Sequence, residues 1–275
     1  MTGLQVTLLG TGTSTGIPVV GCSCRVCTSA DPRDQRLRCA AYVVAETEAG
    51  PVHLVIDTGP DFRQQALRFG IEAVDAVLIT HHHFDHVVGL DDLRPFFFRN
   101  RKPIPVYAPP DTAAVLGEMF SYIFRDGTYP GIAKLDLHEV AESWMVTSRE
   151  GAGAAVEVTP IPAFHGTLPL YGYRIGRFAY LTDVSTIPEA SLPLLEDLDV
   201  LVLDALRHEP HPTHFTIEEA VAMAQRIGAR ATYFIHMTHS LLHAETDAAL
   251  PEGIHLAHDG LRLQVDGQRA TVERP

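Results

Sequence analysis

Side chains that could bind metal are concentrated in residues 81–86, which read HHHFDH directly after the apolar run VDAVLIT. Side chains two positions apart in an extended segment point the same way, so His81, His83 and Asp85 can converge. His86 joins them if the chain turns after Asp85. Four candidate ligands in six residues exceed what one ion needs, and the segment therefore predicts a site for two metal ions.

The residue types indicate what such a site would do. Two divalent ions ~3.5–4 Å apart need an anionic bridge and lower the pKa of a shared water toward neutrality. Imidazole and carboxylate ligands suit Zn, Mn or Fe about equally, so the ligand types do not select the metal. The pattern predicts metal-assisted hydrolysis.

A second group of candidate ligands lies near the N-terminus. Cys22, Cys24 and Cys27 fall within six positions, a spacing too tight for disulfides to connect distant parts of the chain. Three thiolates so close together are typical of a loop that binds a structural Zn. The fourth ligand must come from elsewhere, and Cys39 and His239 are the candidates. This use of cysteine predicts a cytoplasmic protein.

The elements that must position these residues can be read from apolar periodicity. Strands are expected at 4–9, 41–45, 52–57, 74–80, 155–160, 171–175, 178–182, 200–204 and 231–235, and helices near 61–69, 111–124 and 188–196. The stretch 91–150 is otherwise less regular. Another helix should begin after Thr216, where Glu219 completes a capping box, and end at Gly228. Strands interleaved with helices predict a layered α/β or αββα domain.

Composition limits the partners. The chain has 275 residues, 46% hydrophobic and 20% charged, which is the balance of an ordinary globular protein. Its 21 Lys and Arg against 34 Asp and Glu give a net charge of −13, which disfavours nucleic acids and anionic membranes as partners. No apolar run approaches the ~18–20 residues of a membrane span. A small anionic substrate held by metals remains compatible with this charge.

The segment T-H-x-H-x-D-H at the end of a strand resembles the signature of the metallo-β-lactamase superfamily. Further elements match in the same order along the chain: Asp57 in VIDTGP, His165 in AFHG, Asp183 in YLTDVS and His236 in YFIHMTH. The resemblance implies an αββα metallo-β-lactamase sandwich. It also implies a single domain, 1–275, with a cysteine-rich zinc loop at 21–39.

The same resemblance assigns the ligands residue by residue. Metal one would be bound by His81, His83 and His165, metal two by Asp85, His86 and His236, and Asp183 would bridge them. Two divalent ions, Mn or Zn, are expected at this site.

One branch of the superfamily, the accessory cyclic phosphodiesterase of bacterial phosphonate breakdown, is similar in two more respects. It has the same C-x-C-x-x-C loop, and its structural Zn is completed by a histidine three residues after the last catalytic ligand. The resemblance therefore implies a structural Zn on Cys22, Cys24, Cys27 and His239.

The resemblance also implies a proton donor. His214, in HPTHF, matches the catalytic histidine of that branch, and Asp204 matches the acid that orients such a histidine in related RNA-processing members. A carboxylate on one imidazole nitrogen keeps the ring charged near neutral pH, as a general acid requires. His208 and His211 are rivals for this role.

Together these features predict a metal-dependent phosphodiesterase for small substrates, such as cyclic ribosyl or nucleotide phosphodiesters, cleaved by a hydroxide that bridges the two metals. The family suggests a homodimer. An alternative is a tRNA 3′-processing endonuclease, but such enzymes usually insert a tRNA-gripping arm where only residues 166–182 lie here. A second alternative is a quinone-cofactor biosynthesis protein of the same superfamily. A third is a non-enzymatic metal-binding protein, but such a protein would have no need of the Asp204–His214 pair.

Overall fold

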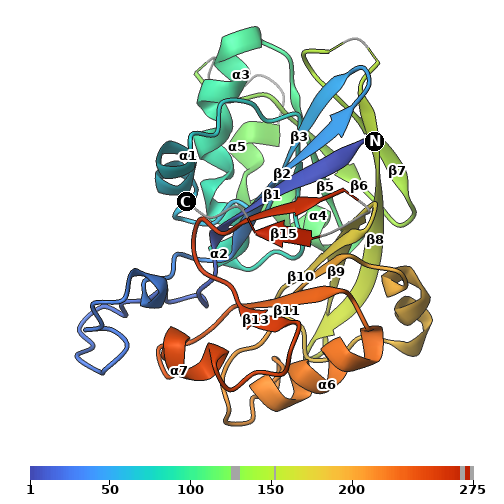
Figure 1. The fold of residues 1–275 in the computed structure, drawn as a ribbon. Coiled ribbons are helices and arrows are strands. Elements are labelled where there is room, and N and C mark those ends of the chain that lie inside the picture. The colour runs from blue at the N-terminus through green and yellow to red at the C-terminus, as the bar shows by residue number, and fades with distance from the viewer. Residues whose placement is uncertain (125–130, 152, 267–269, 273–275) are drawn as a thin grey trace.

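The computed structural model describes residues 1–124, 131–151, 153–266 and 270–272. Their strands form two sheets that pack face to face (Figure 1). The first sheet has the order β15 (Ala270–Val272), β14 (Arg262–Val265), β1 (Gly3–Gly10), β2 (Ala40–Thr47), β3 (Gly50–Ile56), β4 (Ala76–Leu78), β5 (Ile104–Ala108), β6 (Leu135–Glu139). The second has the order β13 (Ile254–Leu256), β12 (Ala231–Ile235), β11 (Val200–Asp204), β10 (Phe178–Leu181), β9 (Leu168–Ile175), β8 (Ala155–His165), β7 (Trp144–Thr147).

Helices cover the outer faces of both sheets (Figure 1). The first sheet is covered by α1 (Phe62–Phe69), α2 (Phe84–Val87), η2 (Val88–Leu93), α3 (Arg94–Asn100), α4 (Pro110–Met119) and α5 (Ser121–Phe124). The second is covered by η3 (Glu189–Leu195) and α6 (Ile217–Ile227), while α7 (His243–Asp247) lies beside β13 and η1 (Pro32–Asp34) lies between β1 and β2. The four layers confirm the predicted αββα arrangement. None of the described helices is long and apolar enough to cross a bilayer.

The core between the sheets is built from the inward-facing residues of both. Leu54 and Leu78 of the first sheet belong to the same buried cluster as Tyr173 and Phe178 of the second. Complete burial of an apolar side chain of this size stabilises a fold by ~1.5–3 kcal/mol. The sheets therefore form a rigid support for the residues at their ends.

Each sheet contains a run of parallel strands. β3, β4, β5 and β6 are parallel neighbours, as are β10, β11, β12 and β13. Parallel strands bring their carboxyl ends to one edge, which is where ligands bind in open α/β sheets. Asp57, His81, Asp183 and His236 all follow the ends of strands in these two runs.

The structure corrects one expectation about secondary structure and refines another. The stretch 91–150 is not irregular, since it contains β5, β6, β7 and α3 as well as the expected α4. The helix expected near 188–196 is the 3₁₀-helix η3, with Pro193 inside it. Proline has no N–H to donate and clashes with the preceding turn, so a regular α-helix is not accessible there.

The expected capping box is confirmed. The Thr216 hydroxyl accepts from the Glu219 N–H at 3.1 Å, and the Glu219 carboxylate accepts from the Thr216 N–H at 2.8 Å. Gly228 ends α6 at φ 71°, in the left-handed region that glycine adopts without strain. Both ends of α6 are therefore fixed by local sequence.

Candidate metal centre

The centre is built where strands of both sheets end. Three of its residues, Asp57, Asp183 and His236, have positive φ angles of 61°, 59° and 62°. Non-glycine residues adopt this region rarely, and such conformations cluster at functional sites, where the surrounding structure holds them. The sharp turn that each residue makes directs its side chain across the edge of the sheets.

The three histidines expected to bind metal one lie together. The ring centroids of His81 and His83 are 4.6 Å apart, those of His83 and His165 are 5.1 Å apart, and those of His81 and His165 are 5.7 Å apart. His165 comes from the end of β8, far away in the sequence from the other two. The fold thus brings His165 to residues 81–86, which contain His81 and His83.

The residues expected to bind metal two also converge. Asp85, His86, Asp183 and His236 place one ligand atom each within 4.8 Å of one another. Asp183 lies at the centre: one carboxylate oxygen is 3.2 Å from His86 Nε2, and the other is 3.1 Å from His236 Nε2 and 4.0 Å from His81 Nε2. A carboxylate that reaches both groups of histidines has the position that a bridging ligand requires.

The path of the chain through this segment differs from the simple alternation expected. His83 is the last extended residue, and α2 begins at Phe84, so Asp85 and His86 reach the centre from a helical turn. The N–H of His86 donates to the carbonyl of His83 at 3.0 Å and closes this turn. An acidic residue in the first turn also suits the partial positive charge of a helix start.

Polar partners behind the ligands orient them. Asp57 accepts from His86 Nδ1 at 2.7 Å and from the N–H and hydroxyl of Thr80, both at 2.9 Å. His165 Nδ1 donates to the carbonyl of Thr213 at 2.8 Å. These bonds fix the tautomers of His86 and His165 and leave Nε2 of each ring for a metal.

The sequence had not identified Thr80 or Thr213 as part of the site. A signal for Thr80 existed, since it directly precedes His81 at the end of the apolar run. Ile56 pairs with Leu78 in the parallel ladder of β3 and β4, so Asp57, one residue further on, and Thr80, two residues further on, meet at one edge. Thr213 acts through its backbone carbonyl, and residue type carries no signal for such a contact.

The donor set fits divalent metal. The Nε2 atoms of His81, His86 and His236 are buried and have no hydrogen-bond partner among the described residues. Burial lowers the pKa of His81 well below its usual range and that of His236 to about 4. Burial also opposes a charge on His86, but Asp183 and Asp57 outweigh it and raise the pKa of that ring well above its usual range. Burial opposes ionisation of Asp183, but the imidazoles of His236 and His86 outweigh it and hold its pKa well below the usual range.

A histidine–aspartate pair lies beside this centre. His214 Nδ1 is 3.2 Å from a carboxylate oxygen of buried Asp204, and the other oxygen accepts from the N–H of Phe215 at 3.1 Å. Burial disfavours the charged His214 ring, but the hydrogen bond and charge of Asp204 outweigh it and raise the pKa of His214. Asp204 also lies 3.4 Å from His236 Nδ1, a contact that the sequence had not indicated.

The rival histidines lie in different surroundings. The ring of His211 is 5.1 Å from that of His214, but its Nδ1 faces Thr213 and it has no carboxylate partner among the described residues. His208 is exposed and lies 2.7 Å from a carboxylate oxygen of Glu218. Of the three, the structure buries only His214 against an acid at the centre.

The three neighbouring cysteines form a cluster with a histidine, on the segment that projects from the body between β1 and β2 (Figure 1). His239 Nδ1 is 3.3 Å from the Cys22 sulfur and 3.5 Å from those of Cys24 and Cys27. The N–H of Cys27 donates to the Cys24 sulfur and lowers the pKa of that thiol to about 6, which favours the thiolate that binds metal. Cys39 is instead buried in the core between the sheets, so the structure brings His239, not Cys39, to this cluster.

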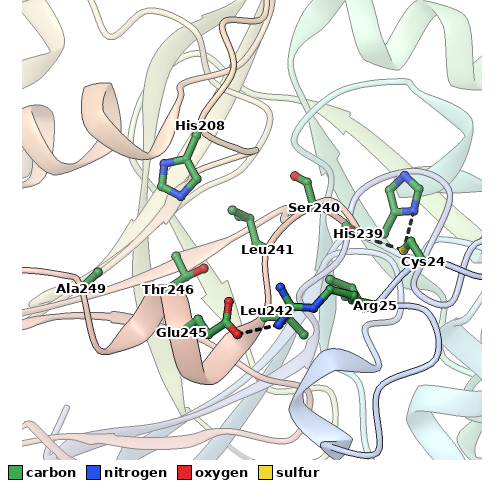
Figure 2. A pocket seen from close by; sticks show the side chains of 11 residues that line it. Cys24, Arg25, His208, His239, Ser240, Leu241, Leu242, Glu245, Thr246 and Ala249 are labelled. Carbon is green, nitrogen blue, oxygen red and sulfur yellow. Dashed lines mark hydrogen bonds and ion pairs between the residues drawn. The ribbon is translucent and has the colours of Figure 1, made fainter.

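A groove of about 460 Å³ lies beside the cysteine cluster, with Cys24 and His239 in its lining and none of the candidate dimetal ligands (Figure 2). Leu241 and Leu242 line it, the Arg25–Glu245 ion pair (2.8 Å) lies along one side, and His208 stands across from them. His208 thus lies in the wall of this groove.

Comparisons with known proteins agree with this geometry. Residues 53–237 match the family model of the beta-lactamase superfamily domain. A crystal structure described as a new diphosphatase from the PhnP family is 44% identical, with a TM-score of 0.84 over 95% of this chain and 97% of that chain. Zn²⁺-bound PqqB from Methylobacterium extorquens, 21% identical with a TM-score of 0.71 over 94% of this chain and 99% of that one, shares the fold.

Two curated relatives carry different names. An octanoyltransferase of Porphyromonas gingivalis is 41% identical over 265 residues, which are 96% of this chain but 52% of that protein, so the chain spans about half its length. A ribonuclease Z of Mycobacterium marinum is 28% identical over 255 residues, 79% of this chain and 90% of that protein. The family model covers more than half of the chain, and the 44% identical structure has the same fold over nearly its whole length. The chain therefore belongs to the metallo-β-lactamase superfamily.

Proposed function

We propose that this chain hydrolyses small phosphodiesters, using two divalent ions, Mn or Zn, bound by the seven converging histidine and aspartate side chains. When bound, such ions neutralise phosphate charge and activate a water for attack. The observation that carries the proposal is the buried Asp204–His214 pair at the edge of the centre. Hydrolysis of an unactivated diester requires a proton for the leaving alkoxide, and this pair is built to supply one.

The position of His214 supports this role. Its ring centroid is 4.5 Å from that of His165 and 4.7 Å from that of His236, so the imidazole faces the candidate ligands. Asp204 holds the Nδ1 side, which leaves Nε2 to donate to the leaving oxygen. The His214 ring is thus fixed in tautomer and orientation, as an efficient general acid must be.

The surroundings of the centre favour a small substrate over tRNA. His165 and Leu168 pair across a short turn between β8 and β9. The chain therefore inserts no tRNA-gripping arm between His165 and Asp183. The net charge of −13 repels an RNA backbone. A cyclic ribosyl or nucleotide phosphodiester meets both conditions.

The cysteine cluster completes the proposal. A Zn held by Cys22, Cys24, Cys27 and His239 would connect the projecting segment to the chain just after His236. Binding energy at such a structural site is folding energy. Free thiolates persist in a reducing compartment, so we place the protein in the cytoplasm.

A second candidate reaction is cleavage of a diphosphate bond, favoured by the 44% identity to the PhnP-family diphosphatase. There the leaving group is a phosphate, which is a much weaker base than an alkoxide and needs less help from an acid. Octanoyl transfer is not proposed, because the match covers only about half of the relative with that name.

A substrate screen separates these reactions. The protein loaded with Mn²⁺ or Zn²⁺ is assayed on a ribosyl 1,2-cyclic phosphate, a 2′,3′-cyclic nucleotide, a dinucleoside diphosphate and a tRNA precursor. Asp183→Asn is the matched control, since asparagine keeps the shape and tolerates the left-handed backbone but cannot bridge as an anion. We expect cyclic diesters to be the best substrates. A strong preference for the dinucleoside diphosphate supports the second candidate, and cleavage of the tRNA precursor alone contradicts both.

A further inference from the structure

The chain that follows His236 connects the two candidate metal sites. Two residues separate His236 at the dimetal centre from His239 in the cysteine cluster, and the next residues line the groove beside that cluster (Figure 2). We call residues 236–241 the connecting segment. His236 has a left-handed backbone with φ 62°, a conformation that is uncommon for residues other than glycine, and neighbouring groups hold the segment in this path.

Part of that support comes from backbone bonds. The N–H of Met237 donates to the carbonyl of Thr11 at 3.1 Å, and the N–H of Thr13 donates to the carbonyl of Met237 at 3.2 Å. The N–H of Thr238 donates to the carbonyl of Leu206 at 3.0 Å. These bonds leave the carbonyls of Thr238 and Leu241 for other donors.

Arg36 supplies those donors from inside the protein. Its side chain is fully buried, and the guanidinium donates to the carbonyl of Thr238 at 2.9 Å and to that of Leu241 at 2.6 Å. The second of these nitrogens also lies 3.3 Å from the carboxylate of Asp34. One planar group therefore fixes two carbonyls three residues apart, on either side of His239.

Asp34 anchors this arginine. Its carboxylate accepts from the N–H of His243 at 2.7 Å and from the Ser29 hydroxyl at 2.6 Å. Ser29 lies two residues after Cys27, so the pair also ties the connecting segment to the cysteine loop. Buried arginines are rare because the ion loses its hydration, and an apolar residue would fill the space at lower cost. A role beyond packing therefore accounts for a charged fork at this position.

We propose that Arg36 is a positioning residue: its guanidinium fixes the connecting segment so that His236 is presented to the dimetal centre. The inference rests on the proposed function, in that it takes His236 as a metal ligand. Arg36 does not reach the reacting atoms and acts only through the backbone that carries His236.

The test compares Arg36→Lys and Arg36→Met with a matched control at another buried ion pair. Lysine keeps the charge but offers a single point donor that cannot span both carbonyls, and methionine removes the charge. The control is Asp199→Asn. Asp199 is equally buried, contacts Arg177 at 3.0 Å and Arg230 at 3.2 Å, and precedes β11, whereas Asp204 ends it. Asp199→Asn thus removes a buried carboxylate near the start of β11, which is the end of that strand farther from the dimetal centre.

Two readouts are measured on the full chain with Zn retained at the cysteine cluster. The first is the Kd for Mn²⁺ alone at the dimetal centre. The second is hydrogen exchange of the amides of residues 237–241 in the metal-free centre. We expect both Arg36 variants to bind Mn²⁺ about 10–100-fold more weakly, as for other changes to groups that orient ligands, and to exchange these amides faster. Asp199→Asn should lower Tm and change neither readout.

If Arg36→Lys binds Mn²⁺ with the wild-type Kd and exchanges the amides of residues 237–241 at the wild-type rate, the proposal is overturned. Lysine keeps the charge and loses only the two-pronged guanidinium, so the guanidinium would then not be needed. Loss of Mn²⁺ affinity in Asp199→Asn equal to that in Arg36→Lys would also overturn it, since the effect would then be general destabilisation. If the wild type binds no Mn²⁺ at the centre, the proposed function fails, and amide exchange alone decides the role of Arg36. If Arg36→Met does not fold, Arg36→Lys carries the comparison.

Discussion

Individual residues at this centre are held by contacts that can be separated experimentally. His86 is oriented by Asp57, His165 by a backbone carbonyl, and His214 by Asp204. Each ring therefore presents one nitrogen in a fixed direction. The roles differ, since the first two nitrogens face candidate metal positions and the third would hold a proton for the leaving group.

The role of His214 predicts a dependence on the leaving group. p-Nitrophenolate leaves without a proton, whereas a sugar alkoxide does not, so general-acid help should appear only with the alkyl substrate. His214→Ala should lower kcat by ~10²–10⁴-fold on an alkyl or ribosyl diester and much less on an aryl diester. Asp204→Asn should act in the same direction more weakly, because it disturbs orientation and charge without removing the acid. The measurement is kcat on both diesters at saturating metal.

His211→Ala is the control for this comparison, because its ring neighbours that of His214 without a carboxylate partner among the residues placed by the structure. It should show little dependence on the leaving group. Equal losses on both substrates for His214→Ala would show that His214 positions substrate or metal. A selective alkyl loss in His211→Ala would move the acid role to that residue.

At the scale of elements, we expect the projecting segment between β1 and β2 to depend on a Zn bound at its cysteine cluster. Cys24→Ser should release one Zn and lower Tm, because a structural metal stabilises the fold that binds it. Zn content by mass spectrometry and Tm by calorimetry are the measurements. His239→Ala should have the same effect as Cys24→Ser, and Cys39→Ser should leave Zn bound. Zn release by Cys39→Ser with no effect of His239→Ala would contradict the proposed ligand set.

The buried carboxyl of Asp259 connects the loop that follows β1 to the segment that precedes β2. Asp259 accepts from the Thr11 hydroxyl at 2.9 Å and from the N–H of Leu37 at 2.8 Å, and burial raises its pKa to about 7. The folded protein therefore binds this proton more tightly than the unfolded chain, whose aspartates titrate near pH ~4. Its contribution to stability is complete below pH ~4 and is lost as the pH rises to about 7.

Asp259→Asn removes this titration and should become more stable relative to the wild type as the pH rises from 4 to 7. The difference in Tm between the two proteins, measured at half-unit steps, tests this directly. A difference that stays constant across the range would show that Asp259 is ionised in the fold throughout.

Elements with local signals were predictable from sequence, and elements defined by pairing partners were not. The capping box of Thr216 and Glu219 and the run ending in Asp204 are local, and the structure confirms both. β5 and β6 are short strands that pair with each other across a long stretch of sequence, and β7 is a four-residue strand that pairs with β8; periodicity alone did not reveal them. The helical turn that begins at Phe84 was not predicted for a related reason, since three histidines in a row fit an extended chain as well as they fit the start of a helix.

At the scale of the whole molecule, the two sheets pack face to face, and the carboxyl ends of their parallel strands lie at one edge. β3 and β4 bring Asp57 and His81, while β10 and β12 bring Asp183 and His236. The resemblance to the superfamily motifs, in their order along the chain, identified these candidate ligands, but only the packing of one sheet on the other shows that Asp183 reaches both groups. The Arg36 contacts could not be foreseen, because a backbone carbonyl has no sequence signature.

The central claim is that this one centre hydrolyses phosphodiesters through Asp183 and the histidines around it. It is tested most directly by the rate of bis-p-nitrophenyl phosphate hydrolysis by the wild type and Asp183→Asn, each with added Mn²⁺ or Zn²⁺ and after chelation. We predict turnover by the metal-loaded wild type, none after chelation, and a loss of ~10³-fold in Asp183→Asn with Tm little changed, because Asp183 would hold the ions whose positive charge stabilises the transition state by several kcal/mol. A metal-loaded wild type without diesterase activity, or an Asp183→Asn variant as active as the wild type, would contradict the claim.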